Sequence, residues 1–277
     1  MSQLIGLVRR HVADSKSPIG FETSGTTAWP VWYRYLTVDG KRAYELGNIC
    51  NTCAFYFERM EGANRDAAIK ELADALAKGV TCLDETLLTD IDQMMPSGDY
   101  MTLLLNLTPR AVTLGGESDY FVSERQANWG LDGFWGLPHH PRVPYYRTGV
   151  RSISGMSGVR NIDGRARLFE FIVPMYPRNW LDQRRLAAYE ADLGKGALPT
   201  AIGISLLDVK SPAVKSGNQE TEDHWCLAHY LLDGHHKVES ASLTGRPISM
   251  ISFLAIKQGV ANAHQIDTTI SKLDWNT

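Results

Sequence analysis

The C-terminal part of this 277-residue chain alternates apolar runs with helix signals, and this order constrains its fold more than any other feature. Four runs have the length and composition of buried strands; they span residues 168–173, 201–207, 225–232 and 248–256. After the first run, Asn179 is expected to cap a helix that continues to about Leu193, and residues 238–243 are expected to form a shorter helix. Strands that alternate with helices in this way predict an α/β unit.

The N-terminal part is richer in aromatic residues and carries both strand and helix signals. Residues 31–38 and 41–46 predict a β-hairpin, because the Asp39-Gly40 dipeptide between them favours a tight turn with positive φ. A helix is expected from a cap at Asn64 to about Lys78, since apolar residues recur there with helical spacing. This part of the chain therefore predicts mixed α and β structure.

Two further signals set the expected domain organisation. Residues 100–107 predict a buried strand, whereas residues 149–164 carry several glycines and serines and indicate a boundary. We therefore expect an N-terminal mixed, aromatic-rich region over residues 1–160 and a C-terminal domain over residues 161–277. The predicted fold class is α/β (α+β).

The composition is that of a globular protein, with 44% hydrophobic and 21% charged residues. A net charge of -3 argues against a general nucleic-acid-binding protein, which is usually basic. No apolar stretch approaches the roughly 18 residues of a membrane helix, and the apolar run near the N-terminus is too short for a secretory signal. We therefore expect a cytoplasmic protein with no membrane partner. Its four cysteines are expected to be reduced thiols or partial metal ligands.

A polar box, Asp233-Gly234-His235-His236-Lys237, follows the third apolar run at the point where a helix is expected. Glycine lets a backbone turn sharply and approach a ligand, and a helix N-terminus offers N–H groups and a positive dipole end to an anion. Histidine and lysine add hydrogen-bond donors and charge, and histidine can also transfer protons near neutral pH. The box therefore predicts a phosphate-binding site; the alternative is a polar surface turn without a ligand.

Residues 166–257 resemble the ParB/sulfiredoxin superfamily, and they look closest to its free-serine-kinase-like branch, in which an Asp-Gly-His-His-Arg-like box is typical. The layout supports the resemblance, because Phe171-Ile172-Val173-Pro174 precedes a helix and Gly196-Ala197-Leu198-Pro199-Thr200 enters a strand. The resemblance implies a ParB/sulfiredoxin-like domain in which nucleotide phosphates contact Gly234, His235, His236 and Lys237. It also implies that Asp233 orients the turn or helps to place a metal.

Three departures limit what the resemblance implies. Lys237 stands where an arginine is usual, and it offers a point charge instead of a bidentate fork. His235 occupies the position of the sulfiredoxin cysteine, which argues against the reduction of sulfinic acids. No helix-turn-helix segment follows the box, which argues against chromosome partitioning.

By resemblance, the leading functional hypothesis is a nucleotide-dependent enzyme, a kinase or phosphotransferase that uses ATP or ADP with Mg²⁺ on a small hydroxyl-bearing metabolite. Its expected catalytic residues are Asp233, His235, His236 and Glu239. A kinase also needs a carboxylate base, for which the candidates by position are Glu170, Asp208 and Glu239. Two alternatives stay open: a non-enzymatic regulatory protein that binds a nucleotide or anion, and a metal-dependent ParB-like nuclease.

Cys50 and Cys53 have the spacing of half a zinc site, which predicts a structural zinc if two more ligands lie nearby. The candidates for those ligands show no diagnostic spacing; they are Cys82, Cys226, His139 and His140. A redox pair is less favoured, because no thioredoxin-like βαβ context surrounds the motif. The simplest alternative is a pair of partly buried cysteines beside the aromatic residues 55–57.

Overall fold

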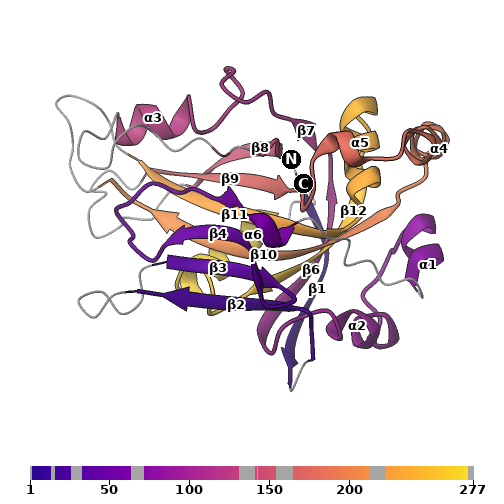
Figure 1. Cartoon of the computed structure of the whole chain (residues 1–277), viewed down its shortest axis with the longest axis horizontal. Coiled ribbons are helices and arrows are strands. Elements are labelled where there is room, and N and C mark those ends of the chain that lie inside the picture. Colours follow the sequence, from indigo (N-terminus) through magenta and orange to yellow (C-terminus); the bar gives the residue numbers. More distant parts are fainter. Residues whose placement is uncertain are drawn as a thin grey trace.

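Two β-sheets pack face to face, and helices cover the other face of the larger sheet (Figure 1). The computed structural model describes residues 2–13, 16–25, 33–63, 72–130, 141, 143–153, 165–212 and 222–273. Within them, the large sheet contains in spatial order β1 (Gln3–Val12), β6 (Gly98–Leu107), β12 (Ile248–Ala255), β10 (Thr200–Lys210), β11 (Asp223–Asp233), β9 (Ala166–Val173), β8 (Tyr146–Ile153) and β7 (Arg110–Ala111). The small sheet contains β2 (Ile19–Ser24), β3 (Tyr33–Val38), β4 (Lys41–Asn48) and β5 (Glu58–Arg59).

The helices of the described residues are mostly short. They are α1 (Ala73–Lys78), α2 (Glu85–Asp92), α3 (Glu124–Trp129), α4 (Gln183–Gly194), α5 (His235–Thr244) and α6 (Ala263–Leu273), with 3₁₀ turns at Glu61–Ala63 and Arg178–Trp180. In Figure 1, α4 and α5 lie near one end of the large sheet and α3 lies near the other. Among the described residues, none of the helices combines the length and the apolarity that a membrane span requires.

The large sheet is mixed, and this confirms the predicted α/β class. The neighbouring strands β10 and β12 run parallel, as do β9 and β11, whereas the other neighbours run antiparallel. Strand β10 is buried on both faces: Ile202 and Ile204 belong to the core beneath the small sheet, while Ala201 and Leu207 belong to the core beneath the helices. Double burial explains why this strand is a continuous apolar run instead of an alternating one.

Both sides of the expected domain boundary contribute strands to the large sheet. Strand β6 from the N-terminal region pairs with β12 from the C-terminal one, so the two regions share one sheet. Ser2, just before β1, donates a hydrogen bond to Glu170 of β9 and accepts one from Arg151 of β8, although four other strands separate β1 from β9. The sheet is therefore strongly curled. The segment 154–164, which holds the expected boundary, lies outside the described residues.

The predicted hairpin is confirmed by β3 and β4, with Asp39 at φ 50° and Gly40 at φ 72°. Two positive φ angles match the twist of the flanking strands, which is why this dipeptide favours the turn. The strands expected within 100–107 and in the four C-terminal runs are also present, as β6, β9, β10, β11 and β12.

Helix boundaries were predicted less well. The prediction that Asn179 caps a helix is wrong, because Asn179 lies in a 3₁₀ turn and Asp182 caps α4 by accepting hydrogen bonds from the N–H groups of Arg184 and Arg185. The helix expected at 238–243 begins earlier, at His235. Of the helix expected from Asn64, the end is present as α1, while residues 64–71 lie outside the described part.

A buried ion pair joins the two sheets. Arg34 of β3 donates to both carboxylate oxygens of Asp208 of β10, at 3.0 and 2.6 Å, and both side chains are almost fully buried. Arg34 also donates to the carbonyl oxygens of Leu46 and Gln258, and Asp208 accepts the N–H of Val260. Burial raises the pKa of Asp208, but the charges of Arg34 and Lys210, together with the hydrogen bonds to the carboxylate, outweigh burial and hold that pKa below its usual value.

We predict that Asp208→Asn lowers the free energy of unfolding by about 3 to 5 kcal/mol, because it leaves the Arg34 charge buried without a carboxylate. Urea denaturation at neutral pH measures this change. Glu22→Gln is the matched control, since it breaks the exposed ion pair with Arg42 and is expected to change stability little. Equal effects of the two substitutions would contradict the prediction.

Candidate functional site

The box lies where β11 ends and α5 begins, at the same edge of the large sheet as the end of the parallel strand β9. Gly234 has φ 95° and ψ 21°, in the left-handed region that favours glycine. A Cβ at this position would lie 2.7 Å from the Cβ of Ala201, so the turn also packs tightly against β10. The sequence prediction of a glycine turn that opens a helix is therefore confirmed.

Both histidines of the box hold the chain that follows β9. His235 Nε2 accepts the backbone N–H of Met175 at 2.9 Å, and His236 Nε2 accepts the N–H of Asp182 at 3.0 Å. A ring nitrogen that accepts a hydrogen bond carries no proton, so the proton of each neutral ring lies on Nδ1. The two side chains thus bind the segment 174–182 near its two ends. The sequence analysis did not predict this role.

His235 is neutral at physiological pH. Burial, together with the neighbouring His236, lowers the pKa of His235 to about 3. The ring also stacks on Tyr176 with centroids 3.9 Å apart. A neutral, stacked ring contributes to the site through packing and through its hydrogen bond, and it brings no positive charge to a phosphate.

The acidic and basic ends of the box pair with each other. Lys237 Nζ donates to Asp233 Oδ2 at 3.0 Å and to the carbonyl oxygen of Thr200 at 2.8 Å. Lys237 is buried, and its side chain ties α5 to the start of β10. The expected site residues Asp233, Gly234, His235, His236 and Lys237 are therefore brought together in one turn of structure.

Glu239, one turn further along α5, is bound by two residues that the sequence did not single out. Arg178 donates to both of its carboxylate oxygens at 2.5 to 3.0 Å, and the hydroxyl of Tyr146 donates to Oε2 at 2.5 Å. Burial and the Glu239 charge raise the pKa of Tyr146, so this hydroxyl stays protonated. Glu239 thereby fixes the guanidinium of Arg178 beside α5.

Exposed groups lie next to the box. The side chain of Trp180 is 56% exposed and stacks on Tyr176, with centroids 6.4 Å apart and ring planes at 21°. The side chain of Arg178, two residues earlier, is 36% exposed. Because Tyr176 also stacks on His235, the three rings form an aromatic column that leads from the box to the surface. The sequence analysis did not single out Trp180, because it placed this residue inside the helix expected after Asn179.

The other two candidate bases lie away from the box. Glu170, in the middle of β9, is 3.2 Å from His229 Nε2, and the other ring nitrogen of His229 is 2.7 Å from Ser205 Oγ. All three side chains are buried in the core, so this network is a structural one. Asp208 is held by Arg34, as described above.

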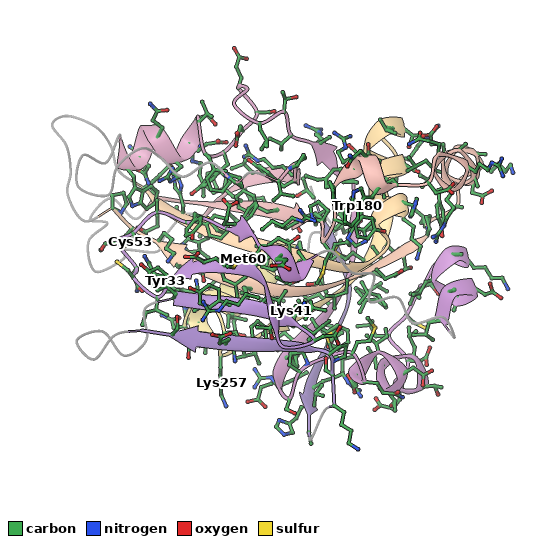
Figure 2. All side chains as sticks on the ribbon, in the orientation of Figure 1. Tyr33, Lys41, Cys53, Met60, Trp180 and Lys257 are labelled. Atoms are coloured by element: carbon green, nitrogen blue, oxygen red, sulfur yellow. The ribbon has the colours of Figure 1, made fainter. Side chains whose placement is uncertain are left out.

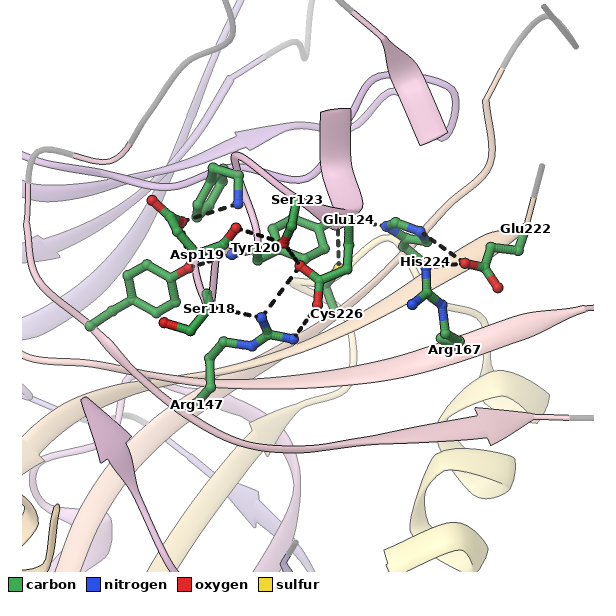
Figure 3. A network of polar contacts seen from close by, with 12 residues as sticks. Ser118, Asp119, Tyr120, Ser123, Glu124, Arg147, Arg167, Glu222, His224 and Cys226 are labelled. Carbon is green, nitrogen blue, oxygen red and sulfur yellow. Dashed lines mark hydrogen bonds and ion pairs between the residues drawn. The ribbon is translucent and has the colours of Figure 1, made fainter. Parts of the chain in front are cut away.

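A second polar cluster occupies the opposite end of the large sheet (Figure 3). His224 Nδ1 is 2.9 Å from the hydroxyl of Tyr120, and its Nε2 is 3.8 Å from Glu222. Burial lowers the pKa of His224, although Glu222 opposes this effect. The thiol of Cys226 donates to the same Tyr120 hydroxyl at 3.7 Å. Aromatic rings enclose His224, which makes it a core residue.

The zinc hypothesis for Cys50 and Cys53 stays a prediction. Across the described ranges, no group of three or more His, Cys, Asp or Glu side chains is arranged to hold a metal. His139 and His140, two of the candidate ligands, lie outside those ranges.

The chain matches no protein-family model, no curated protein and no solved structure. Its observed order β9-α4-β10-β11-α5-β12 is the order of strands and helices expected from the sequence. The resemblance to the ParB/sulfiredoxin superfamily stays a prediction that depends on the box and this order.

We predict that Gly234→Ala lowers the free energy of unfolding by about 2 to 5 kcal/mol, because it adds left-handed strain and a clash with Ala201. Gly245→Ala is the matched control: Gly245 has φ 65°, but nothing lies within 4 Å of a Cβ there. Its cost is expected to be only the strain, about 1 to 2 kcal/mol. Chemical denaturation compares the two, and equal costs would refute the role of close packing.

We also predict a pH effect from His235. Its folded pKa of about 3 lies below the unfolded value of about 6.5, so the unfolded chain binds the extra proton and stability falls as pH drops below about 6.5. The slope from this residue approaches about 1.4 kcal/mol per pH unit. His235→Gln should flatten the profile between pH 5 and about 6.5 relative to the unsubstituted chain. Parallel profiles from denaturation at several pH values would show the assignment to be wrong.

Proposed function

We propose that this chain binds a nucleotide at the first turn of α5, with the phosphates at the helix N-terminus and the base stacked on Trp180. The observation that carries the proposal is the aromatic column Trp180-Tyr176-His235, which joins an exposed ring to the glycine turn. The resemblance to the ParB/sulfiredoxin superfamily implies the same place for the phosphates. A cytoplasmic location and a small-molecule partner are parts of the proposal.

The phosphate half of the site uses backbone and arginine. The positive end of the dipole of α5 lies at this turn and favours an anion there. Arg178 adds a partly exposed guanidinium whose direction Glu239 fixes. In this arrangement, the histidines position the segment around the anion instead of donating charge to it.

The base half of the site uses stacking. Alanine substitution of an aromatic residue that stacks on a base typically costs about 1 to 3 kcal/mol, and every base has a face that can stack. Trp180 has one face on Tyr176, and more than half of its surface is exposed. A nucleobase could therefore extend the aromatic column by one ring.

Binding is better supported than phosphate transfer. Each candidate base already has protein donors: Glu239 accepts from Arg178 and Tyr146, Glu170 from Ser2, and Asp208 from Arg34. Oxygens that already accept hydrogen bonds within the protein must give up those bonds before they can take a proton from a substrate. This favours the non-enzymatic alternative, although Glu239 lies on α5 itself and is the base to test for a phosphotransferase.

We predict that ATP or ADP with Mg²⁺ binds, and that Trp180→Ala raises the Kd at least about fivefold, since it removes the stacking surface. Isothermal titration calorimetry measures the Kd for ATP, ADP, CTP and inorganic phosphate. Leu243→Ala is the control: this exposed apolar residue lies near the other end of α5, and its loss should leave the Kd unchanged.

The outcomes separate three alternatives. Equal binding of nucleotide and inorganic phosphate, with no effect of Trp180→Ala, would reduce the site to an anion site. No heat with any ligand would refute the proposal. Transfer of phosphate to a hydroxyl compound that Glu239→Gln abolishes, while nucleotide binding is retained, would establish the phosphotransferase instead of the binding protein.

A further inference from the structure

The loop after β4 carries Cys50 and Cys53; in Figure 2, Cys53 lies at the left of the molecule and Trp180 lies right of its centre, so the two are well apart. Other parts of the chain hold the backbone of this loop. Lys210 Nζ donates to the carbonyl oxygen of Cys50 at 2.9 Å, and the indole N–H of Trp129 donates to that of Thr52 at 2.8 Å. The loop is therefore anchored to β10 and α3, although it has no regular structure of its own.

Hydrogen-bond donors converge on the sulfur of Cys50. The backbone N–H of Cys53 donates to Cys50 Sγ at 3.2 Å, and the hydroxyl of Thr52 lies 3.1 Å from it. Donors of this kind stabilise a sulfur that carries negative charge, as in cysteines that react with disulfides.

Both cysteines of the loop are partly exposed. Cys50 and Cys53 are of intermediate exposure, whereas Cys226 is buried and Cys82 is exposed, and all four are free thiols. Because the backbone N–H of Cys53 contacts Cys50 Sγ, the two cysteines are neighbours in space, as a disulfide with sulfurs about 2 Å apart requires. A small reagent can therefore reach the pair, and after one thiol has reacted the second thiol lies next to it.

A buried cation lies beneath the loop. Lys210 is 1% exposed and lies 3.8 Å from Asp208, and its Nζ contacts the backbone of Asn48 as well as that of Cys50. These two hydrogen bonds hold the backbone on which Cys50 lies.

We propose that Cys50 and Cys53 form a reversible redox couple that exchanges electrons with small disulfides, with Cys50 as the sulfur that attacks first. The sulfur of Cys50 attacks one sulfur of the external disulfide, forms a mixed disulfide and releases the first thiol. Cys53 then loses its proton to solvent and attacks the sulfur of Cys50, which releases the second thiol. Two protein thiols are oxidised to one disulfide, and the external disulfide is reduced to two thiols.

Oxidation of the full chain with oxidised glutathione, followed by peptide mapping under non-reducing conditions, tests the proposal. We expect a Cys50–Cys53 disulfide that dithiothreitol reverses. Cys53→Ser should accumulate a glutathione adduct on Cys50, whereas Cys50→Ser should form the adduct on Cys53 at least about tenfold more slowly. Cys82→Ser is the control, and it should leave the rate of Cys50–Cys53 disulfide formation unchanged.

Two results would overturn the proposal. One is that Cys50 and Cys53 both remain open to alkylation after oxidation while Cys82 forms an adduct. The other is that the purified protein carries one zinc per chain and its two thiols react only after chelation, which would establish the zinc site predicted from the sequence instead. Far-ultraviolet circular dichroism of each variant verifies that it is folded before its rate is interpreted.

Discussion

The first turn of α5 is the point on which the C-terminal part of the structure depends. Buried polar groups need partners, and this turn supplies them to several elements at once. His235 and His236 accept N–H groups from the segment after β9, and Lys237 binds the start of β10. In the next turn of the helix, Ser240 donates to a carbonyl of α4. Removing any of these side chains would leave a buried donor or acceptor without its partner.

These contacts also explain why the site has two unlike halves. The side chains of the box make hydrogen bonds within the protein, and the charges of Asp233 and Lys237 pair with each other, so the turn is rigid. Arg178 and Trp180, next to the box, stay partly exposed. A rigid turn with exposed groups at its rim is a preorganised arrangement, which lowers the entropy lost on binding. Glu239, on the next turn of α5, is held in the same way by Arg178 and Tyr146, which disfavours its use as a base.

The chemistry-bearing residues gather at two opposite ends of one curled sheet. The ends of the parallel strands β9 and β11 meet at the edge that carries the box, and the end of β10 brings Lys210 to the other edge, beneath the cysteine loop. The Arg34–Asp208 pair fixes the small sheet on the large one, close to Lys210. Strand direction therefore separates the proposed nucleotide site from the proposed dithiol.

The sequence by itself determined the local features. Asp39-Gly40 defined a hairpin, the apolar runs defined β9, β10, β11 and β12, and the box predicted a turn into a helix. These features follow from the preferences of neighbouring residues, which act over a few positions. Only the tertiary structure decided that β6 pairs with β12, that Asp182 and not Asn179 caps α4, and that Tyr146, Arg178 and Trp180 surround α5. Such contacts join residues far apart in the chain, and they depend on burial and on the satisfaction of polar groups, which no local pattern specifies.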